Sequence, residues 1–286
     1  MTILIAGCGD LGTEAGLRFA AAGHRVVGWR RSPGKLPAVI EGAAADLSSP
    51  DLPPVPADTT AVVVAVAADS PTEEAYRAAY VDGLSHVLEA LERDGVTPRR
   101  VLFVSSTAVY GDAGGGWIDE STTPTPGSFS GRIIREAENL LHDRLREKPT
   151  AAVALRLGGI YGPGRTRLID QVRNGAAVVP NEPRYTNRIH RDDAAGAIVH
   201  LCTMDDAPSP FYLGVDDDPA ELGDVLRFLA GELGLQEPPS GNMGDGRGGN
   251  KRCSNKLLRG TGYSFTYPTF REGYRAILAG IGARHP

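Results

Sequence analysis

The chain has 286 residues and a formal net charge of −5 at neutral pH. Hydrophobic residues make up 41% and charged residues 23%, a balance that excludes an intrinsically disordered chain. The mild acidity, without a basic stripe, argues against a nucleic-acid partner. No apolar run approaches the ~20 residues of a membrane helix, and no export signal precedes the first strand pattern. We therefore expect a cytoplasmic protein without a membrane partner.

Short β-branched runs alternate with helical patterns up to about Gly158, which is typical of a parallel sheet covered by helices on both faces. The pattern loosens after that residue, although two further helices are indicated. The predicted strands are Ile3–Ala6, Arg25–Trp29, Ala43–Ala45, Ala61–Val66, Arg100–Ser105 and Ala152–Leu157, and the predicted helices are Gly12–Ala22, Glu73–Arg93, Gly131–Arg146, Asp224–Gly234 and Phe270–Leu278.

These elements predict an α/β fold, a Rossmann-type doubly wound parallel sheet with a smaller C-terminal substrate domain. We expect the dinucleotide-binding domain over residues 1–164, with a return segment at 187–214, and the smaller substrate-binding part over 165–186 and 215–286. The glycine-rich stretch 241–249 has two interpretations, a mobile loop or a lid that orders over bound substrate. The three cysteines are far apart and fit neither a disulfide framework nor a zinc spacing, so we expect no metal site.

A glycine motif, Gly7-Cys-Gly9-Asp-Leu-Gly12, follows the first predicted strand and opens the first predicted helix. The first glycine of such a motif allows a tight turn, the second lets the backbone approach a pyrophosphate, and the third lets helix and strand pack closely. The helix N-terminus adds amide donors for the phosphates. We therefore predict a dinucleotide site with cofactor contacts from Gly7, Gly9, Asp10, Leu11 and Gly12.

The end of the second strand indicates which dinucleotide is bound. An NAD site would place an acidic residue there, against the ribose hydroxyls. This chain has Arg30, Arg31 and Ser32 instead, two guanidinium groups and a hydroxyl that suit a 2′-phosphate. We predict NADP(H) as the cofactor, against the alternative that the arginines form a solvated basic corner.

Segments along nearly the whole chain resemble the extended short-chain dehydrogenases/reductases of the NAD-dependent epimerase/dehydratase family, in an atypical branch. By this resemblance Asp46 would hold the adenine amino group and Ala67 would line the nicotinamide side. The matching segments are Asp46-Leu47, Ala65–Ala68, Ser105–Gly111, Leu155–Arg165, Asn187–Asp193 and Gly273-Tyr274.

The chain departs from this family at its catalytic group, which is a Ser or Thr with Tyr-x-x-x-Lys. Ser106 matches the serine, but no tyrosine lies between Tyr110 and Tyr161. One alignment places Ser128 at the tyrosine and Arg132 at the lysine. We favour it because it keeps a cation for the ribose hydroxyls.

The other alignment places Ser130 and Ile134 at these positions. A serine hydroxyl is a far weaker acid than a phenol, so Ser128 could orient a water but not replace the tyrosine. Tyr110, Tyr161, His190 or a substrate-held water could supply the proton instead. Of these residues, we keep Tyr161 with Ser106, Ser128 and Arg132 in the predicted catalytic set.

Six arginines between Arg165 and Arg191, with two acids among them, suit either an anionic small-molecule substrate or a solvated basic face. We keep three hypotheses for function. The first is an NADP(H)-dependent oxidoreductase that acts on a carbonyl or imine without the usual tyrosine. The second is a sugar-nucleotide epimerase or dehydratase, and the third is a non-catalytic NADP(H)-binding sensor. A homodimer is the one assembly we consider.

Overall fold

The structure is a computed structural model that describes residues 1–242 and 249–286. Most of the glycine-rich stretch 241–249 lies outside these ranges, so both interpretations of it stay predictions. Among the described residues, no helix is both long and apolar enough to cross a membrane.

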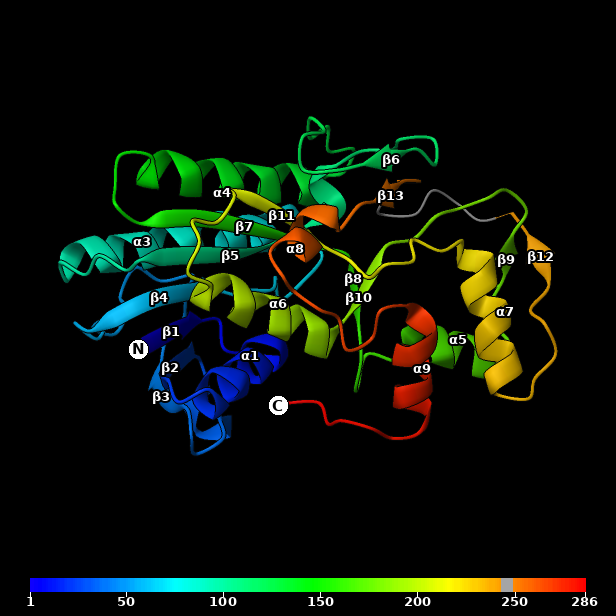
Figure 1. The fold of residues 1–286 in the computed structure, drawn as a ribbon, viewed down its shortest axis with the longest axis horizontal. Coiled ribbons are helices and arrows are strands. Elements are labelled where there is room, and N and C mark those ends of the chain that lie inside the picture. Colours follow the sequence, from blue (N-terminus) through cyan, green and yellow to red (C-terminus); the bar gives the residue numbers. More distant parts are fainter. Residues whose placement is uncertain (243–248) are drawn as a thin grey trace.

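A seven-stranded, all-parallel sheet forms the centre of the molecule, in the order β11-β7-β5-β4-β1-β2-β3 (Figure 1). The chain moves from β1 outward to β3 and then returns to the other side of β1, so the strand order reverses between β1 and β4. Ligands of doubly wound sheets bind at such a switch point. This arrangement confirms the predicted Rossmann-type fold. The strands are β1 (Thr2–Ala6), β2 (Arg25–Arg30), β3 (Glu41–Ala44), β4 (Thr59–Val64), β5 (Arg100–Ser106), β7 (Ala151–Leu157) and β11 (Phe211–Gly214).

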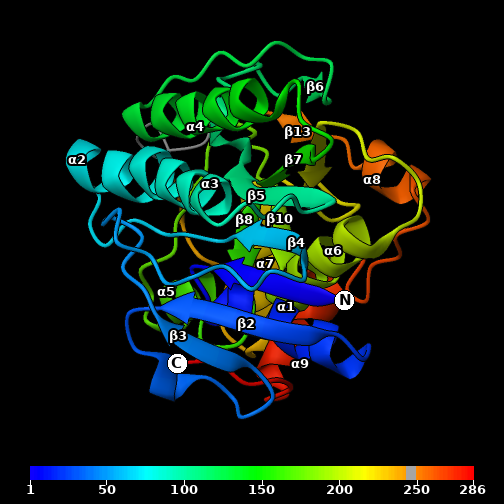
Figure 2. The same cartoon turned by 90° about the vertical axis from the view of Figure 1, so that its left-hand side faces the viewer.

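Helices cover both faces of this sheet (Figure 2). α1 (Asp10–Ala21) and α6 (Arg191–Thr203) pack on one face, and α3 (Gly83–Arg93) and α4 (Phe129–Leu145) pack on the other. The central strands are therefore buried on both sides, which explains their continuous apolar runs. On the second face, α2 (Glu73–Tyr76) runs through a π-helical turn into α3.

A smaller group of helices lies beyond the carboxyl ends of the strands (Figure 1). It has its own hydrophobic cluster, in which Leu226 and Phe270 are buried. A capping box of Thr269 and Glu272 starts the last helix. Three pairs of short parallel strands lie outside the central sheet. The helices of this group are α5 (Arg167–Arg173), α7 (Leu222–Glu232) and α9 (Phe270–Leu278), and the strand pairs are β8 (Gly159–Tyr161) and β10 (Arg188–His190), β9 (Val179–Pro180) and β12 (Ser240–Gly241), and β6 (Trp117–Ile118) and β13 (Arg252–Cys253). α8 (Lys256–Gly260) instead contacts β11, and its Leu258 is buried in the core of the main sheet.

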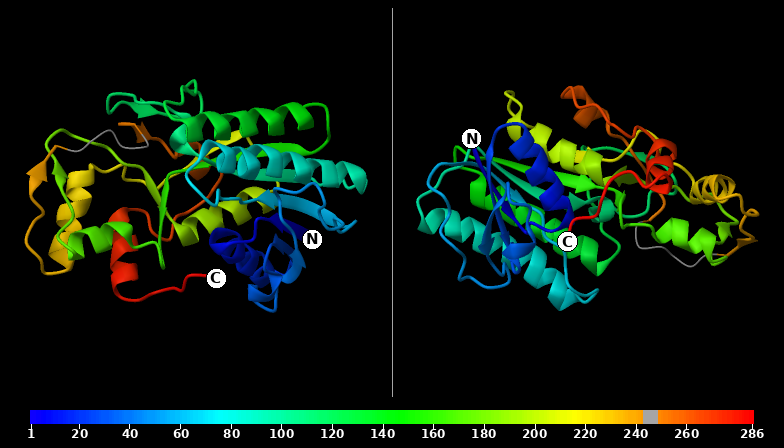
Figure 3. Two further views of the ribbon diagram at one scale, coloured as in Figure 1. Left: turned by 180° about the vertical axis from the view of Figure 1, so that it is seen from behind. Right: turned by 90° about the horizontal axis from the view of Figure 1, so that it is seen from below.

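The expected strands and helices of the first 158 residues are present with shifted ends, but the sequence analysis missed two later elements of the main unit. One is α6, which buries small residues such as Ala194 and Ala197 together with charged ones, so its apolar period is weak. The other is the four-residue strand β11. After α9 the chain runs back to the start of α1, where the backbone amide of His285 donates to Asp10 (Figure 3).

Candidate cofactor and substrate cavities

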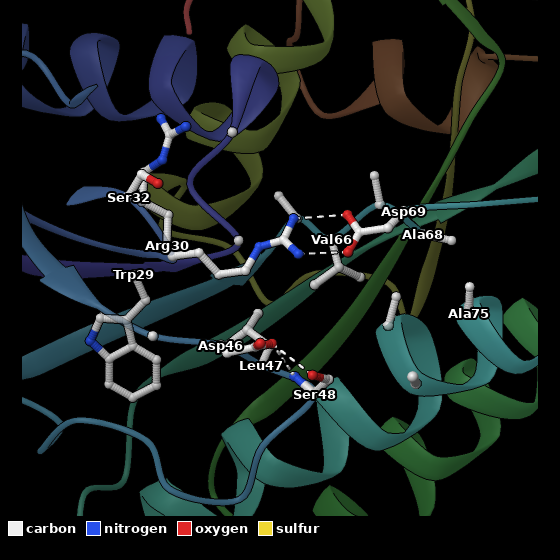
Figure 4. A pocket seen from close by; sticks show the side chains of 18 of the residues that line it. Trp29, Arg30, Ser32, Asp46, Leu47, Ser48, Val66, Ala68, Asp69 and Ala75 are labelled. Carbon is white, nitrogen blue, oxygen red and sulfur yellow. Dashed lines mark hydrogen bonds and ion pairs between the residues drawn. The ribbon is translucent and has the colours of Figure 1, made fainter. Parts of the chain in front are cut away.

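The first cavity, of about 570 Å³, lies at the carboxyl ends of β1, β2 and β4, beside the point where the strand order reverses (Figure 4). The registers Ala6↔Trp29 and Ala6↔Val64 bring these three ends level. The residues that line it are Gly7, Gly9, Trp29, Arg30, Arg31, Ser32, Lys35, Ala45, Asp46, Leu47, Ser48, Ala65, Val66, Ala67, Ala68, Asp69, Ala75, Ala78 and Ala79.

The three motif glycines occupy the positions that their predicted roles require. Gly7 has a φ of +82°, and a Cβ on it would lie 2.7 Å from the Ala65 carbonyl oxygen. A Cβ on Gly12 would meet the Ile5 side chain at 3.0 Å, which reflects close packing of α1 on β1. A Cβ on Gly9 would meet no atom within 4 Å, so open space lies above its backbone. The cavity thus leaves room for a pyrophosphate where the motif predicts one.

The N-terminus of α1 has no side-chain cap, so its first amides remain available as donors. The Asp10 carboxylate at this end is held by Arg165 Nε at 2.9 Å and by Arg191 Nη1 at 3.1 Å. These two ion pairs connect the start of α1 to distant parts of the chain. Only the backbone at this end of the helix is then left to contact a cofactor. Leu11 is buried in the core against the sheet.

The residues predicted to select the cofactor lie together at one end of the first cavity. Arg30 Nη1 donates to the Pro286 carbonyl oxygen at 2.8 Å. Arg31 forms a two-bond ion pair with Asp69, at 2.6 and 2.8 Å, in which both side chains are mostly exposed. Lys35 adds a third cation that the sequence analysis missed, because it lies in the 3-10 turn after β2.

Asp46 and Ala67, the two cofactor residues assigned by resemblance, also line this cavity. The Asp46 carboxylate accepts hydrogen bonds from the Ser48 amide at 3.1 Å and the Ser48 hydroxyl at 2.7 Å (Figure 4). Ser32 and Ala67 line the cavity as well. Their individual contacts with a cofactor stay predictions.

The second cavity, of about 510 Å³, extends from the end of β5 towards the smaller group of helices. Five of the described lining residues are cationic, and no described lining residue carries a carboxylate. Arg188 is buried, and its Nη1 makes no hydrogen bond within the described ranges. The lining residues are Ser106, Thr107, Ala108, Gly158, Gly159, Ile160, Tyr161, Arg165, Arg167, Leu168, Arg184, Tyr185, Thr186, Asn187, Arg188, Leu222, Gly249, Lys251 and Tyr274.

Ser106 ends β5 and faces this second cavity. Its hydroxyl oxygen accepts a hydrogen bond from the Ala108 amide at 3.1 Å and so caps the short turn Thr107–Val109. A Cβ on Gly131 would lie 2.2 Å from the Ala108 carbonyl oxygen, so the start of α4 packs directly against this turn. The serine hydroxyl retains its own proton for donation to a ligand.

A buried ionic cluster supports the segment that carries Ser106. Glu138 of α4 is fully buried and binds Arg156 through two hydrogen bonds, at 2.8 and 2.7 Å. It also accepts from the Ser105 hydroxyl at 2.6 Å and from Arg135 at 2.9 Å. Arg156 Nη1 donates to the Tyr110 hydroxyl at 2.5 Å. These bonds join β5, β7 and α4 beneath the serine.

Neither alignment of the missing tyrosine and lysine brings its residues into the described lining of the first or second cavity. Ser128 caps α4 by accepting from the Gly131 amide at 3.1 Å, and its oxygen lies 3.0 Å from that of Ser130. Arg132 is exposed, whereas Ile134 is buried in the core. None of these four residues lines the first or second cavity. Catalytic roles for Ser128 and Arg132 stay predictions.

Among the other proton donors considered, only Tyr161 lines the second cavity. Its hydroxyl lies 3.4 Å from the Thr269 carbonyl oxygen, and burial raises its pKa. The Tyr110 hydroxyl donates to the Asp119 carbonyl oxygen at 3.1 Å, and burial raises its pKa to about 12. His190 caps α6 through a bond from the Asp192 amide, and burial lowers its pKa to about 4.

Lys251 lines the second cavity and was missed by the sequence analysis. It is buried, and its Nζ donates to the Tyr110 carbonyl oxygen at 3.4 Å. The search for a basic partner considered only the helix after Ser106, and Lys251 lies far beyond it in sequence. One available signal was the scarcity of lysine, since only four of the 30 basic residues are lysines.

A parallel sheet with a glycine-rich turn at its switch point and a cavity on the same edge defines an NAD(P)-binding Rossmann protein. The family model described as the NAD dependent epimerase/dehydratase family matches residues 3–214. The chain belongs to this family, as the resemblance of its motifs indicated.

Known proteins similar to this chain include Protein YeeZ of Escherichia coli (strain K12), which is 30% identical over 171 residues. This alignment spans 59% of each chain. The solved structure of an NAD-dependent epimerase/dehydratase from Methylobacillus flagellatus is 38% identical, covers 98% of both chains and has a TM-score of 0.78. The human epimerase family protein SDR39U1, solved with NADPH, shares the fold at 19% identity with a TM-score of 0.81, over 98% of this chain and all of that one.

Proposed function

We propose that the protein is an NADP(H)-dependent oxidoreductase that acts on a carbonyl or imine of a small anionic substrate. The observation that carries this proposal is the second cavity, in which Ser106 shares a wall with five cationic side chains and with no carboxylate among the described lining residues. The cavity thus combines a hydroxyl group that can polarise a carbonyl or imine with cationic side chains that can bind an anionic substrate.

NADP(H) is supported by the charges at the far end of the first cavity. Arg30, Arg31, Ser32 and Lys35 line it there, and Arg31 is held by a solvent-exposed aspartate that a phosphate can displace. NADPH is also the cofactor bound in the human structural relative. Gly7, Gly9 and the α1 amides would hold the pyrophosphate. When bound, the reduced nicotinamide would supply the hydride.

The hydrogen bonding and the exposure of the cationic side chains in the second cavity support an anionic substrate. A buried guanidinium nitrogen without a hydrogen bond is costly unless a ligand satisfies it. Arg188 Nη1 makes no hydrogen bond to a described residue, and a carboxylate or phosphate is the ligand that a guanidinium binds best. Arg167 is exposed at the same cavity and could complete the binding of such an anion.

The experiment that tests this function follows NADPH absorbance with a panel of 2-oxo acids, phosphorylated aldehydes, cyclic imino acids and neutral ketones. We expect turnover of an anionic member and none of its neutral analogue. Ser106→Ala should lower kcat by about 10²–10³, the typical effect of losing one preorganised donor, without a change in NADPH affinity. Binding of NADPH without turnover of any compound would support a sensor instead.

The same cations could also hold the pyrophosphate of a sugar nucleotide, which the family membership makes the second candidate. Such reactions use a tyrosine as base, and no tyrosine stands at the start of α4. Sugar nucleotides therefore belong in the panel with product analysis by chromatography, because an epimerase restores its cofactor and leaves the absorbance unchanged.

A further inference from the structure

The missing tyrosine leaves the proposed reaction without an evident acid, and the lining of the second cavity contains several groups that could replace it. Ser106 can donate a hydrogen bond, but its hydroxyl is too weak an acid to give up its proton. Tyr161 aims its hydroxyl at a backbone carbonyl, 3.4 Å away. Of the other side chains that line the cavity, the arginines keep their protons at all accessible pH values. Three acids remain among the described lining residues, Tyr185, Tyr274 and Lys251. Burial raises the pKa of Tyr274, and the Tyr185 ring packs on the Arg252 guanidinium, whereas Lys251 contacts the segment that follows Ser106.

Lys251 is linked to Ser106 through the short turn Thr107–Val109 and the residue that follows it. Its Nζ donates to the Tyr110 carbonyl oxygen at 3.4 Å, and Tyr110 directly follows the turn that the Ser106 hydroxyl caps. Both residues line the same cavity. A ligand that fills this cavity could therefore contact both the hydrogen-bond donor and the ammonium group.

The backbone around Lys251 is held on both sides. Asn187 donates to the Lys251 carbonyl oxygen at 3.0 Å and accepts from the Cys253 amide at 2.7 Å. The Asn250 amide donates to Asp112 at 2.7 Å, and β13 continues the segment by pairing with β6. A group fixed in this way loses little entropy when it acts, which is the property of a preorganised catalytic residue.

We propose that Lys251 is the residue that gives a proton to the substrate's carbonyl oxygen or imine nitrogen. This inference rests on the proposed function. As the hydride forms the new C–H bond, the π electrons of the C=O or C=N bond move to the heteroatom. The heteroatom takes a proton from Nζ, and the neutral amine that remains regains a proton from water.

Burial favours this role, because it lowers the pKa of the Lys251 ammonium from its usual value. A lower pKa makes the group a stronger acid and brings it closer to the operating pH. The protonated form is the active one in reduction, so the rate should fall as the pH rises through this lowered pKa.

The first test needs neither substrate nor cofactor. The chain contains four lysines, and Lys35, Lys148 and Lys256 are exposed whereas Lys251 is buried. We would label lysine with ¹³C and ¹⁵N, assign the Lys251 signal by its loss in Lys251→Arg, and titrate the whole protein by NMR. We expect this signal to titrate below the other three. Titration together with them would overturn the proposal.

The second test uses whichever panel compound the wild type reduces. Lys251→Arg keeps the charge but cannot release its proton. It should therefore lower kcat by about 10²-fold or more, leave KM within a few-fold and abolish the alkaline fall of the pH profile. Lys251→Met should also raise KM. Lys256→Arg, an exposed change in the same segment, serves as the control and should match the wild type.

The outcomes separate this proposal from the one on which it rests. If the wild type turns over no compound, the proposed function fails, and the proton-donor role fails with it. If the wild type is active and Lys251→Arg retains its kcat and pH profile, Lys251 only anchors the anion, and the proposed function stands. Thermal melting of each variant checks that the fold is intact.

Discussion

The two cavities are built in different ways. The first draws its lining from residues 7–79, at consecutive strand ends and the helix that follows them. The second collects residues from separated segments between Ser106 and Tyr274. Glycines and open backbone shape the first, whereas buried charges and the ion pairs behind them shape the second. The conformation of a short glycine motif depends on neighbouring residues, so it can be predicted from the local sequence. The charge of a cavity depends on which distant segments of the chain pack together.

The largest expected effect concerns the buried charges behind the second cavity. Glu138→Ala should destabilise the protein by about 3–5 kcal/mol, because it leaves the Arg156 guanidinium buried without its partner. Glu136→Ala on the same helix is the matched control. Its two-bond pair with Arg77 is exposed, so its loss should cost at most about 1 kcal/mol. Urea denaturation measures both, and equal losses would contradict the contrast that we draw.

A methyl group added at Gly9 in the first cavity should weaken cofactor binding and leave the stability of the protein unchanged. A Cβ on Gly9 meets no atom within 4 Å, so Gly9→Ala should melt like the wild type. The methyl group would occupy the space that the pyrophosphate needs, and NADPH should bind at least about 10-fold more weakly, or ~1.4 kcal/mol.

Gly7→Ala should behave in the opposite way. Its φ of +82° and its contact with the Ala65 carbonyl predict a loss of about 1–2 kcal/mol in stability. Calorimetric titration and thermal melting of both variants separate the two effects. A destabilised Gly9→Ala would show that the space above this glycine is filled.

The cofactor preference tests whether the first cavity also depends on charge. We expect NADPH to bind at least about 10-fold more tightly than NADH, because Arg30, Arg31 and Lys35 line the end of the cavity. Arg30→Asp should reverse much of this preference. Lys148→Asp, an exposed change that alters the net charge equally, should leave the ratio unchanged. Equal affinities of the wild type for the two cofactors would refute the prediction.

The smallest effect concerns the exposed ion pair at the mouth of the first cavity. Asp69→Asn releases the Arg31 guanidinium from its carboxylate partner. NADPH should then bind a few-fold more tightly, which is within the ~1 kcal/mol that such a surface pair contributes. The free energy of unfolding should hardly change. Weaker binding in this variant would mean that Asp69 itself supports the cofactor.

The sequence by itself determined the sheet and the location of the dinucleotide site. The glycine motif between β1 and α1 and the apolar strands depend on backbone conformation and burial over a few residues, and such local requirements leave periodic patterns. It also revealed the loss of the catalytic tyrosine, because a missing residue in a linear motif is visible without coordinates.

Only the tertiary structure decided what occupies the space around Ser106. It brought Lys251 beside the turn that follows the serine and turned Arg132 to solvent. It also engaged the Asp10 carboxylate with arginines that lie more than 150 residues away in sequence. These contacts join segments through folding and follow no period or spacing along the chain. The charge of a cavity depends on which side chains pack around it, and the order of these side chains in the sequence does not reveal which ones do.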